Sequence, residues 1–283
     1  MEEEYLKLMN EALMSGARQR NRTGIDSFMI PGAMLKFDLQ KGFPAVTTKK
    51  LAFNAVKGEL IGFLRGYTSA AQFRELGCNI WNQNANENQA WLANSNRTGV
   101  DDLGYIYSKL WTEMPNPEGE SWNQISRLIR DIRADPTSRR LIVSAWHPEV
   151  FHKAALPPCH VLFQVILDQE EKVLHLNMYQ RSCDLFLGVP FNIASYSLLA
   201  HMLGRMTGYT PKWFTWFGGD CHVYENHVEQ VWTQLSREPL PPPQLSLEMG
   251  TAIENDNIAL VEPENISLIN YNHHPPLTAP MAV

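Results

Sequence analysis

Helix-like and strand-like segments follow one another in this chain without the strict strand–helix–strand alternation that builds a parallel sheet. Three strand candidates, 140–146, 160–168 and 172–180, come in succession, and a long apolar helix over about 192–206 follows them. The 283 residues contain no repeat, no low-complexity linker and no clear domain boundary. We therefore predict one α+β domain over 1–283, with a large mixed or antiparallel sheet flanked by helices.

Hydrophobic periodicity places the other elements. It predicts helices over 4–16, 53–65, 122–133 and 224–236, with Gly66 ending the second of them. Alternation predicts strands at 34–39 and 212–217, and a last strand near 244–248. The segment 82–102 is rich in Asn and Gly, which indicates a long loop with one short helix.

Composition narrows the functional classes. The formal net charge of −6 argues against sequence-independent binding of nucleic acid, which needs a cationic face. The four cysteines form no CxxC pair, so the sequence predicts neither a metal site nor a disulfide scaffold. The acidic start of the chain has no signal-peptide core, and no apolar run approaches membrane-spanning length. We expect a cytoplasmic protein with reduced thiols.

A candidate nucleophile lies in the run Leu156-Pro157-Pro158-Cys159-His160. The two prolines set the backbone just before a predicted strand, and a cysteine at that point can face a cleft. The alternative is a small buried side chain, which is the commoner state of a single cysteine. His160 does not complete a Cys–His dyad, because adjacent residues on a strand point to opposite faces.

Arginines at loop and strand edges are a second signal. Taken singly, Arg22, Arg139, Arg140 and Arg181 read as surface charges. The pair Arg139-Arg140 precedes an apolar strand, however, so at least one guanidinium is expected near a buried surface. The planar fork of such a group suits phosphate.

A third signal is the stretch 180–192, in which Gly188 and Pro190 break the backbone and Asn192 opens the predicted helix. An asparagine at that position is a natural helix N-cap. Its amide can also donate and accept at once, which matches O4 and N3–H of uracil. An aspartate there would suit cytosine instead.

Together these segments are similar to the thymidylate synthase family almost from end to end. The matching segments are 22–24, 43–49, Glu59, 80–81, 138–140, 157–160, 180–196, 218–224 and 279–283. The resemblance implies an α+β homodimer joined through its sheet and a reaction at C5 of dUMP with 5,10-methylenetetrahydrofolate. It implies that the thiolate of Cys159, favoured by nearby arginines, adds to C6 and makes C5 nucleophilic.

The resemblance also implies residue roles. The implied catalytic residues are Cys159, Glu59, Tyr107, Asn192 and Arg181, with Glu59 handling protons through water. The implied nucleotide-binding residues are Arg22, Arg181, Ser182, Asp184, Asn192, His222 and Tyr224, together with Arg139 and Arg140 of the partner subunit. The implied folate-binding residues are Lys49, Trp81, Asn82, Asp184, Gly188, Phe191, Ala282 and Val283.

One wall of the cavity departs from the family pattern. Asn82, Leu110 and Thr112 stand where the family usually has Asp, Gln and Arg. The related deoxycytidylate hydroxymethylases of phages carry similar changes, but they have Asp where this chain keeps Asn192. This combination predicts hydroxymethylation of dUMP. The alternatives are ordinary thymidylate synthesis and, more distantly, a non-catalytic nucleotide- or RNA-binding role.

Overall fold

A mixed six-stranded sheet forms the centre of the protein, in the order β1-β2-β8-β7-β6-β5. The computed structural model describes residues 2–21, 24–115 and 119–281. The strands are β1 (Ala17–Gln19), β2 (Ser27–Asp38), β5 (Ile142–Ser144), β6 (His160–Asp168), β7 (Val173–Asp184) and β8 (Thr210–Tyr224). Neighbouring strands pair antiparallel except β7 and β8, which pair parallel. The predicted mixed sheet is confirmed.

Helix α8 (Gly188–Thr207) makes the crossover between the two parallel strands, as parallel pairing requires. Most of its side chains are buried, because it lies between the sheet and α2 (Phe53–Leu64). A helix that is apolar all round belongs in a core. Gly208 ends it with a left-handed backbone, φ 80°.

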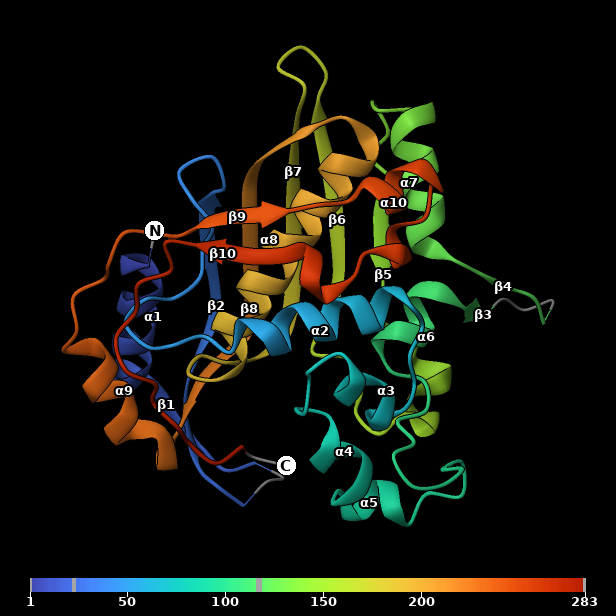
Figure 1. The fold of residues 1–283 in the computed structure, drawn as a ribbon. Coiled ribbons are helices and arrows are strands. Elements are labelled where there is room, and N and C mark those ends of the chain that lie inside the picture. Colours follow the sequence, from blue (N-terminus) through green and yellow to red (C-terminus); the bar gives the residue numbers. More distant parts are fainter. Residues whose placement is uncertain (1, 22–23, 116–118, 282–283) are drawn as a thin grey trace.

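The remaining elements surround this core (Figure 1). Along one edge lie α1 (Glu3–Ser15) and α9 (Val228–Leu235). The other elements are α3 (Ala70–Glu75), α4 (Asn82–Asn86), α5 (Gln89–Leu92), α6 (Tyr107–Thr112), α7 (Gln124–Ala134), α10 (Gly250–Glu254), β3 (Met114–Pro115), β4 (Ser121–Trp122), β9 (Gln244–Leu247) and β10 (Ile266–Ile269), with the 3-10 turns η1 (Pro148–Lys153), η2 (Glu225–His227), η3 (Ile258–Leu260) and η4 (Pro263–Asn265). Within the described residues, no helix is long and apolar enough to cross a membrane.

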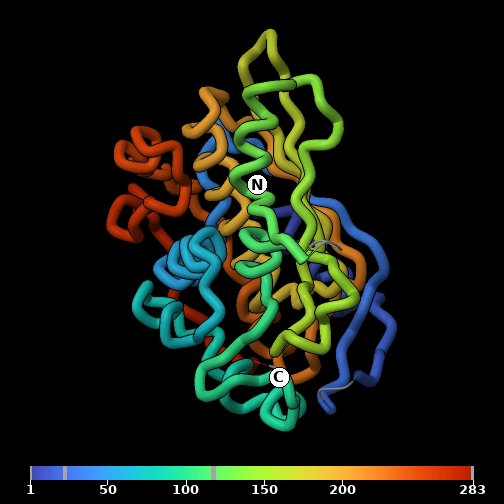
Figure 2. The backbone as a smooth tube through the Cα atoms, turned by 90° about the vertical axis from the view of Figure 1, so that its right-hand side faces the viewer, coloured from blue at the N-terminus to red at the C-terminus, as the bar shows by residue number. Residues whose placement is uncertain are grey.

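The sheet is covered unequally on its two faces. Figure 2 shows α2 and the β9–β10 pair on one side of the strands. On the other face, Met34, Ile142, Ile166 and Tyr179 are 40–60% exposed, although all four are large and apolar. A hollow of about 390 Å³ on this face is lined by Met34, Lys36, Ile166, His175, Asn177, Trp213, Thr215 and Phe217. We call this surface the open sheet face.

Several element boundaries differ from the sequence predictions. Helix α8 begins at Gly188 instead of 192, because the first turn of a helix tolerates both Gly188 and Pro190. Strand β8 continues far beyond 217 through two glycines, since β2 and β7 pair with it on both sides. Segment 82–102 holds two short helices, and β10 follows β9, so 244–248 is not the last strand.

Candidate active site

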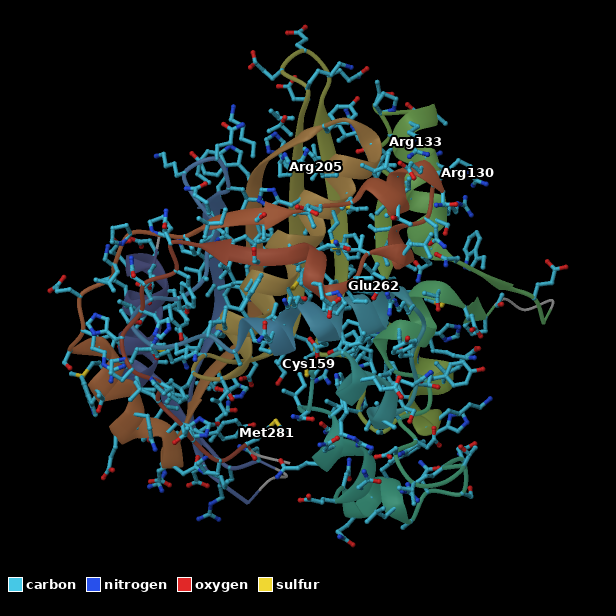
Figure 3. All side chains as sticks on the ribbon, viewed as in Figure 1. Arg130, Arg133, Cys159, Arg205, Glu262 and Met281 are labelled. Carbon is cyan, nitrogen blue, oxygen red and sulfur yellow. The ribbon has the colours of Figure 1, made fainter. Side chains whose placement is uncertain are left out.

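Cys159 lies on a loop that other parts of the chain hold in place. Its backbone N–H donates to the Tyr107 hydroxyl at 2.6 Å, and its carbonyl accepts from the Arg181 N–H at 2.8 Å. The Arg181 guanidinium donates to the carbonyls of Pro157 and Pro158 at 3.0 and 2.9 Å. Cys159 is half-buried and lies below α2 in the view of Figure 3. The sulfur is thus placed by a locked backbone and is not sealed in the core.

His160 points away from this loop into the core, as the strand geometry predicted. Its ring stacks on Tyr107 with centroids 3.8 Å apart, and its Nδ1 bonds the Tyr196 hydroxyl at 2.7 Å. Burial lowers the pKa of His160 to about 3, so the ring is neutral at physiological pH. The expectation that it forms no dyad with Cys159 agrees with this geometry. Tyr196, which lies 36 residues away, was not singled out from the sequence.

Glu59 is a buried acid on α2. Its Oε1 accepts from Trp81 Nε1 at 2.9 Å, and its residue is only 4% exposed. Burial raises the pKa of Glu59 to about 8, although the Trp81 hydrogen bond opposes the shift. The Trp81 and Tyr107 rings meet edge to face at 6.2 Å. Glu59 therefore carries a proton at neutral pH and is linked through Trp81 to the tyrosine that holds Cys159.

Tyr107 is the second proton-bearing group beside Cys159. Burial raises the pKa of its hydroxyl well above the ordinary value, so the hydroxyl remains protonated. While its oxygen accepts from Cys159, the O–H can still donate to another acceptor.

Asn192 is not the N-cap of α8, since the helix begins four residues earlier with Leu187 in the cap position. Its Oδ1 accepts from Gln180 Nε2 at 3.0 Å. Gln180 in turn accepts from Trp216 Nε1 at 2.9 Å, which fixes which end of its own amide donates. The network orients the Asn192 amide with its NH₂ available as a donor. Gln180 lies in the stretch 180–192, but the sequence assigned it no role, and no sequence signal pointed to Trp216.

Asp184 and Gly188 frame a space beside Asn192. Asp184 Oδ1 accepts from the N–H groups of Phe186 and Leu187 at 2.9 and 3.1 Å. A Cβ on Gly188 would lie 3.7 Å from the Asp184 side chain and 3.8 Å from Asn192 Oδ1. The missing side chain therefore keeps this space open. An anchored carboxylate beside such a space fits the flat, hydrogen-bonding pterin ring of methylenetetrahydrofolate, and half-buried Phe191 lies on the same turn of α8.

The carboxyl ends of β7 and β8 bring further polar residues to the same edge of the sheet. Because these strands are parallel and in register, Ser182 lies opposite Asp220, and Asp184 lies opposite His222. His222 Nδ1 bonds Asp220 Oδ1 at 2.7 Å, which leaves Nε2 for another partner. The His222 and Tyr224 rings meet edge to face at 5.0 Å. The structure thus gathers Ser182, Asp184, His222 and Tyr224 as expected.

The two arginines predicted to act across subunits lie apart from this cluster. Arg139 and Arg140 are exposed just before β5, the edge strand of the sheet. Gln164 Nε2 donates to the Arg139 carbonyl at 3.1 Å, which ties this stretch to β6. Their guanidinium groups remain available to a partner molecule, and their role in phosphate binding stays a prediction. Arg22 lies outside the described residues.

Among the other predicted folate contacts, Lys49 is buried. Its Nζ donates to the Phe186 carbonyl and lies 3.5 Å from the centre of that ring. Burial lowers the pKa of Lys49 to about 7. A contact of Lys49 with the folate tail stays a prediction. Ala282 and Val283 lie outside the described residues.

The three residues that depart from the family pattern are packed or paired. Asn82 Oδ1 accepts from Arg74 at 2.8 Å. Leu110 is fully buried, and the Thr112 hydroxyl donates to the Ser108 carbonyl of its own helix at 2.9 Å. Neither the Asn82 carbonyl oxygen nor the Thr112 hydroxyl is left as an unpartnered polar atom.

Comparison with known proteins agrees with this site. A family model described as thymidylate synthase matches residues 3–283. Proteins named thymidylate synthase from Pseudomonas syringae pv. tomato, Pseudomonas putida and Bordetella bronchiseptica are 42%, 43% and 42% identical to this chain. Each match covers 99% of both chains. The chain belongs to the thymidylate synthase family, whose members are enzymes that use 5,10-methylenetetrahydrofolate to modify C5 of a pyrimidine nucleotide.

Proposed function

We propose that this enzyme converts dUMP to dTMP and releases dihydrofolate. The observation that carries the proposal is the locked Cys159 loop, whose Tyr107 anchor is also linked through Trp81 to the buried acid Glu59. A nucleophile, a fixed hydroxyl and a protonated acid are thus linked by a continuous series of contacts.

Cys159 is the proposed nucleophile. Its sulfur adds to C6 of uracil, and the electrons displaced from the C5–C6 bond make C5 nucleophilic. Arg181 contacts the two residues before Cys159, so its positive charge favours the thiolate. The bound folate supplies the one-carbon unit and, for a methyl product, the hydride.

Asn192 is the proposed reader of the base. Its oriented NH₂ can donate to O4 of uracil, while its carbonyl oxygen has a second lone pair for N3–H. Cytosine presents the opposite pattern at both positions and would be rejected. The preference for uracil thus depends on the Trp216–Gln180–Asn192 network as well as on Asn192 itself.

Glu59 and Tyr107 are the proposed proton-handling groups. With its pKa raised by burial to about 8, Glu59 holds a proton that it can give to the base and recover later. Trp81 keeps the carboxyl in place by donating to one oxygen, which leaves the other oxygen to act through water.

The hydroxymethyl product predicted from the altered wall has weaker support than the methyl product. The curated relatives are bacterial proteins named thymidylate synthase, and they give no support to a phage origin. Attack by water would need an ordered water at the wall. Leu110 is apolar and buried, so it supplies no hydrogen-bonding site for one, and the Thr112 hydroxyl already uses its proton within α6.

The open sheet face supports a homodimer. Its exposed apolar side chains and its hollow form a surface of the kind that associating proteins bury. Arg139 and Arg140 lie at an edge of the same sheet, where a second subunit could receive them. We infer that the pair enters the partner's phosphate site.

Product analysis tests the proposal. The enzyme is incubated with dUMP and methylenetetrahydrofolate, the nucleotide is weighed by mass spectrometry, and dihydrofolate is followed by its absorbance. We expect dTMP and dihydrofolate in equal amounts. A 5-hydroxymethyl nucleotide with tetrahydrofolate would instead favour the reading from the altered wall. In that case the triple change Asn82→Asp, Leu110→Gln and Thr112→Arg should raise the share of dTMP.

A further inference from the structure

The C-terminal segment, residues 271–281, runs along α9 and ends on the side of the molecule where α4 and α5 lie (Figures 1 and 2). Figure 3 shows its Met281 below Cys159 in that view. Side chains hold the segment along its length. The contacts are Tyr271 Oη to the Val46 carbonyl at 2.6 Å, Arg237 to the Pro275 carbonyl at 2.8 Å, Gln230 to the Thr278 carbonyl at 3.5 Å and His227 to the Pro280 carbonyl at 2.8 Å.

His227 differs from the other anchors because its ring also faces the site. The residue is fully buried in η2, with the rings of Phe186 and Tyr224 each centred 5.5 Å away. A carbonyl oxygen only accepts, so Nε2 must carry the proton in the bond to Pro280. Nδ1 is buried without a hydrogen-bond partner in the part of the chain that the structure describes, and it lies 3.9 Å from Asp184 Oδ1.

This arrangement is incomplete as it stands. A separation of 3.9 Å is too long for a direct hydrogen bond, and a buried polar atom without a partner costs about 1–3 kcal/mol. A lone pair on Nδ1 would also face the Asp184 carboxylate unfavourably. The other ionisable groups near this pair include His222, which lies opposite Asp184 in the sheet, and Tyr224. They also include Lys49, whose Nζ is held by the Phe186 carbonyl, and Tyr5, whose hydroxyl donates to the Leu185 carbonyl. A small shift of the ring or of Asp184, together with a proton on Nδ1, would complete the contact, because a carboxylate only accepts.

We propose that His227 is a positioning residue that couples docking of the C-terminal segment to the position of the Asp184 carboxylate. One nitrogen of the ring donates to the Pro280 carbonyl, and the other, carrying a second proton, donates to Asp184 once that carboxylate engages the folate. The proposal rests on the proposed function, because it takes Asp184 as a folate ligand. By linkage, whatever factor the docked segment adds to folate affinity, bound folate must add to docking of the segment.

Gln230 provides a matched control on the same stretch of chain. It also holds the segment, through Thr278, but the structure gives it no contact with Asp184. The change Gln230→Met therefore weakens the segment's attachment alone. The change His227→Gln does the reverse, because an amide can still donate to Pro280 but offers nothing toward Asp184. The change His227→Phe removes both contacts.

The experiment measures steady-state kinetics and release of C-terminal residues by carboxypeptidase, with dUMP saturating and with or without a folate analogue. For His227→Gln we expect a KM for methylenetetrahydrofolate raised roughly tenfold, the loss expected for one buried hydrogen bond, with the KM for dUMP within about twofold. Carboxypeptidase release without the analogue should match wild type, but the analogue should no longer slow it. His227→Phe should in addition speed release without the analogue.

Gln230→Met should show faster release without the analogue, an unchanged KM for folate and full protection by the analogue. The proposal is overturned if His227→Gln keeps the wild-type KM and the wild-type response to the analogue, or if Gln230→Met loses both. If His227→Phe does not fold, the comparison of His227→Gln with Gln230→Met still tests the proposal. If the chain does not catalyse a folate-dependent reaction of dUMP at all, wild-type enzyme will show no folate-dependent conversion of dUMP, which is a different result.

Discussion

The change Glu59→Gln tests the idea that a buried, protonated acid sits in this site. Glu59 is 4% exposed, and its Oε1 accepts a hydrogen bond from Trp81 Nε1 at 2.9 Å. Glutamine keeps the shape of the side chain and an oxygen that can accept from Trp81, but it cannot ionise. The substitution therefore isolates the ionisation of one carboxyl group.

The expected change in the free energy of unfolding follows from the pKa of Glu59, which burial raises from 4.5 to about 8. Between these values the folded protein holds a proton that the unfolded chain has released. The stability that this proton contributes is complete below pH 4.5 and is lost as pH rises through 8. Between pH 5 and pH 8 the loss is on the order of 3–4 kcal/mol. Glu59→Gln does not undergo this loss. Between pH 5 and pH 8, its free energy of unfolding should therefore rise relative to that of wild type by about the same amount.

Urea denaturation of both proteins at pH 5, 6.5 and 8 measures the difference, at one protein concentration because a dimer's stability depends on it. The exposed change Glu229→Gln on α9 is the control and should run parallel to wild type. Parallel profiles for Glu59→Gln as well would refute the reasoning, because they would mean that Glu59 ionises normally. The same variant should lose roughly 10²–10⁴-fold in kcat if the acid handles protons in the reaction.

Three further substitutions test the rest of the site. Cys159→Ser should lower turnover by on the order of 10³–10⁶-fold and stop exchange of the C5 proton with solvent, while equilibrium dialysis still shows dUMP binding. Mixing Cys159→Ser subunits with Arg140→Ala subunits should restore activity through one complete site in each heterodimer; no recovery would mean that each site comes from a single chain. Asn192→Asp should move the ratio of kcat/KM values for dUMP and dCMP by roughly 100-fold or more toward dCMP, and an unchanged ratio would place base reading elsewhere.

Local sequence signals were sufficient for the parts of the site that depend on neighbouring residues. The two prolines before Cys159 indicated a fixed backbone at the start of a strand, and β6 does begin at His160. The alternation of strand residues also predicted that His160 turns away from Cys159, and it lies in the core against Tyr107.

Contacts between distant segments could not be predicted from the sequence, because no local pattern encodes them. Asn192 was read as a helix cap or a base reader, but the amide is oriented by Gln180 and Trp216 from two different strands. The sequence placed Glu59 within the predicted helix 53–65. Its burial, however, depends on Trp81, which follows α3 in the chain. The shifted pKa that gives Glu59 its proposed role is therefore a property of the assembled fold.

The topology separates the proposed binding residues at the strand ends from the altered wall. The only parallel pair in the six-stranded sheet, β7 and β8, is joined by α8, so Asp184, Asn192 and His222 are brought together by the crossover itself. Leu110 and Asn82 belong to α6 and α4, two short helices outside the sheet. Substitutions at these two positions leave the strand ends unchanged, although Tyr107 on α6 and Trp81, which precedes α4, belong to the proposed proton-handling network. A changed wall beside an intact crossover is compatible with the proposed conversion of dUMP to dTMP.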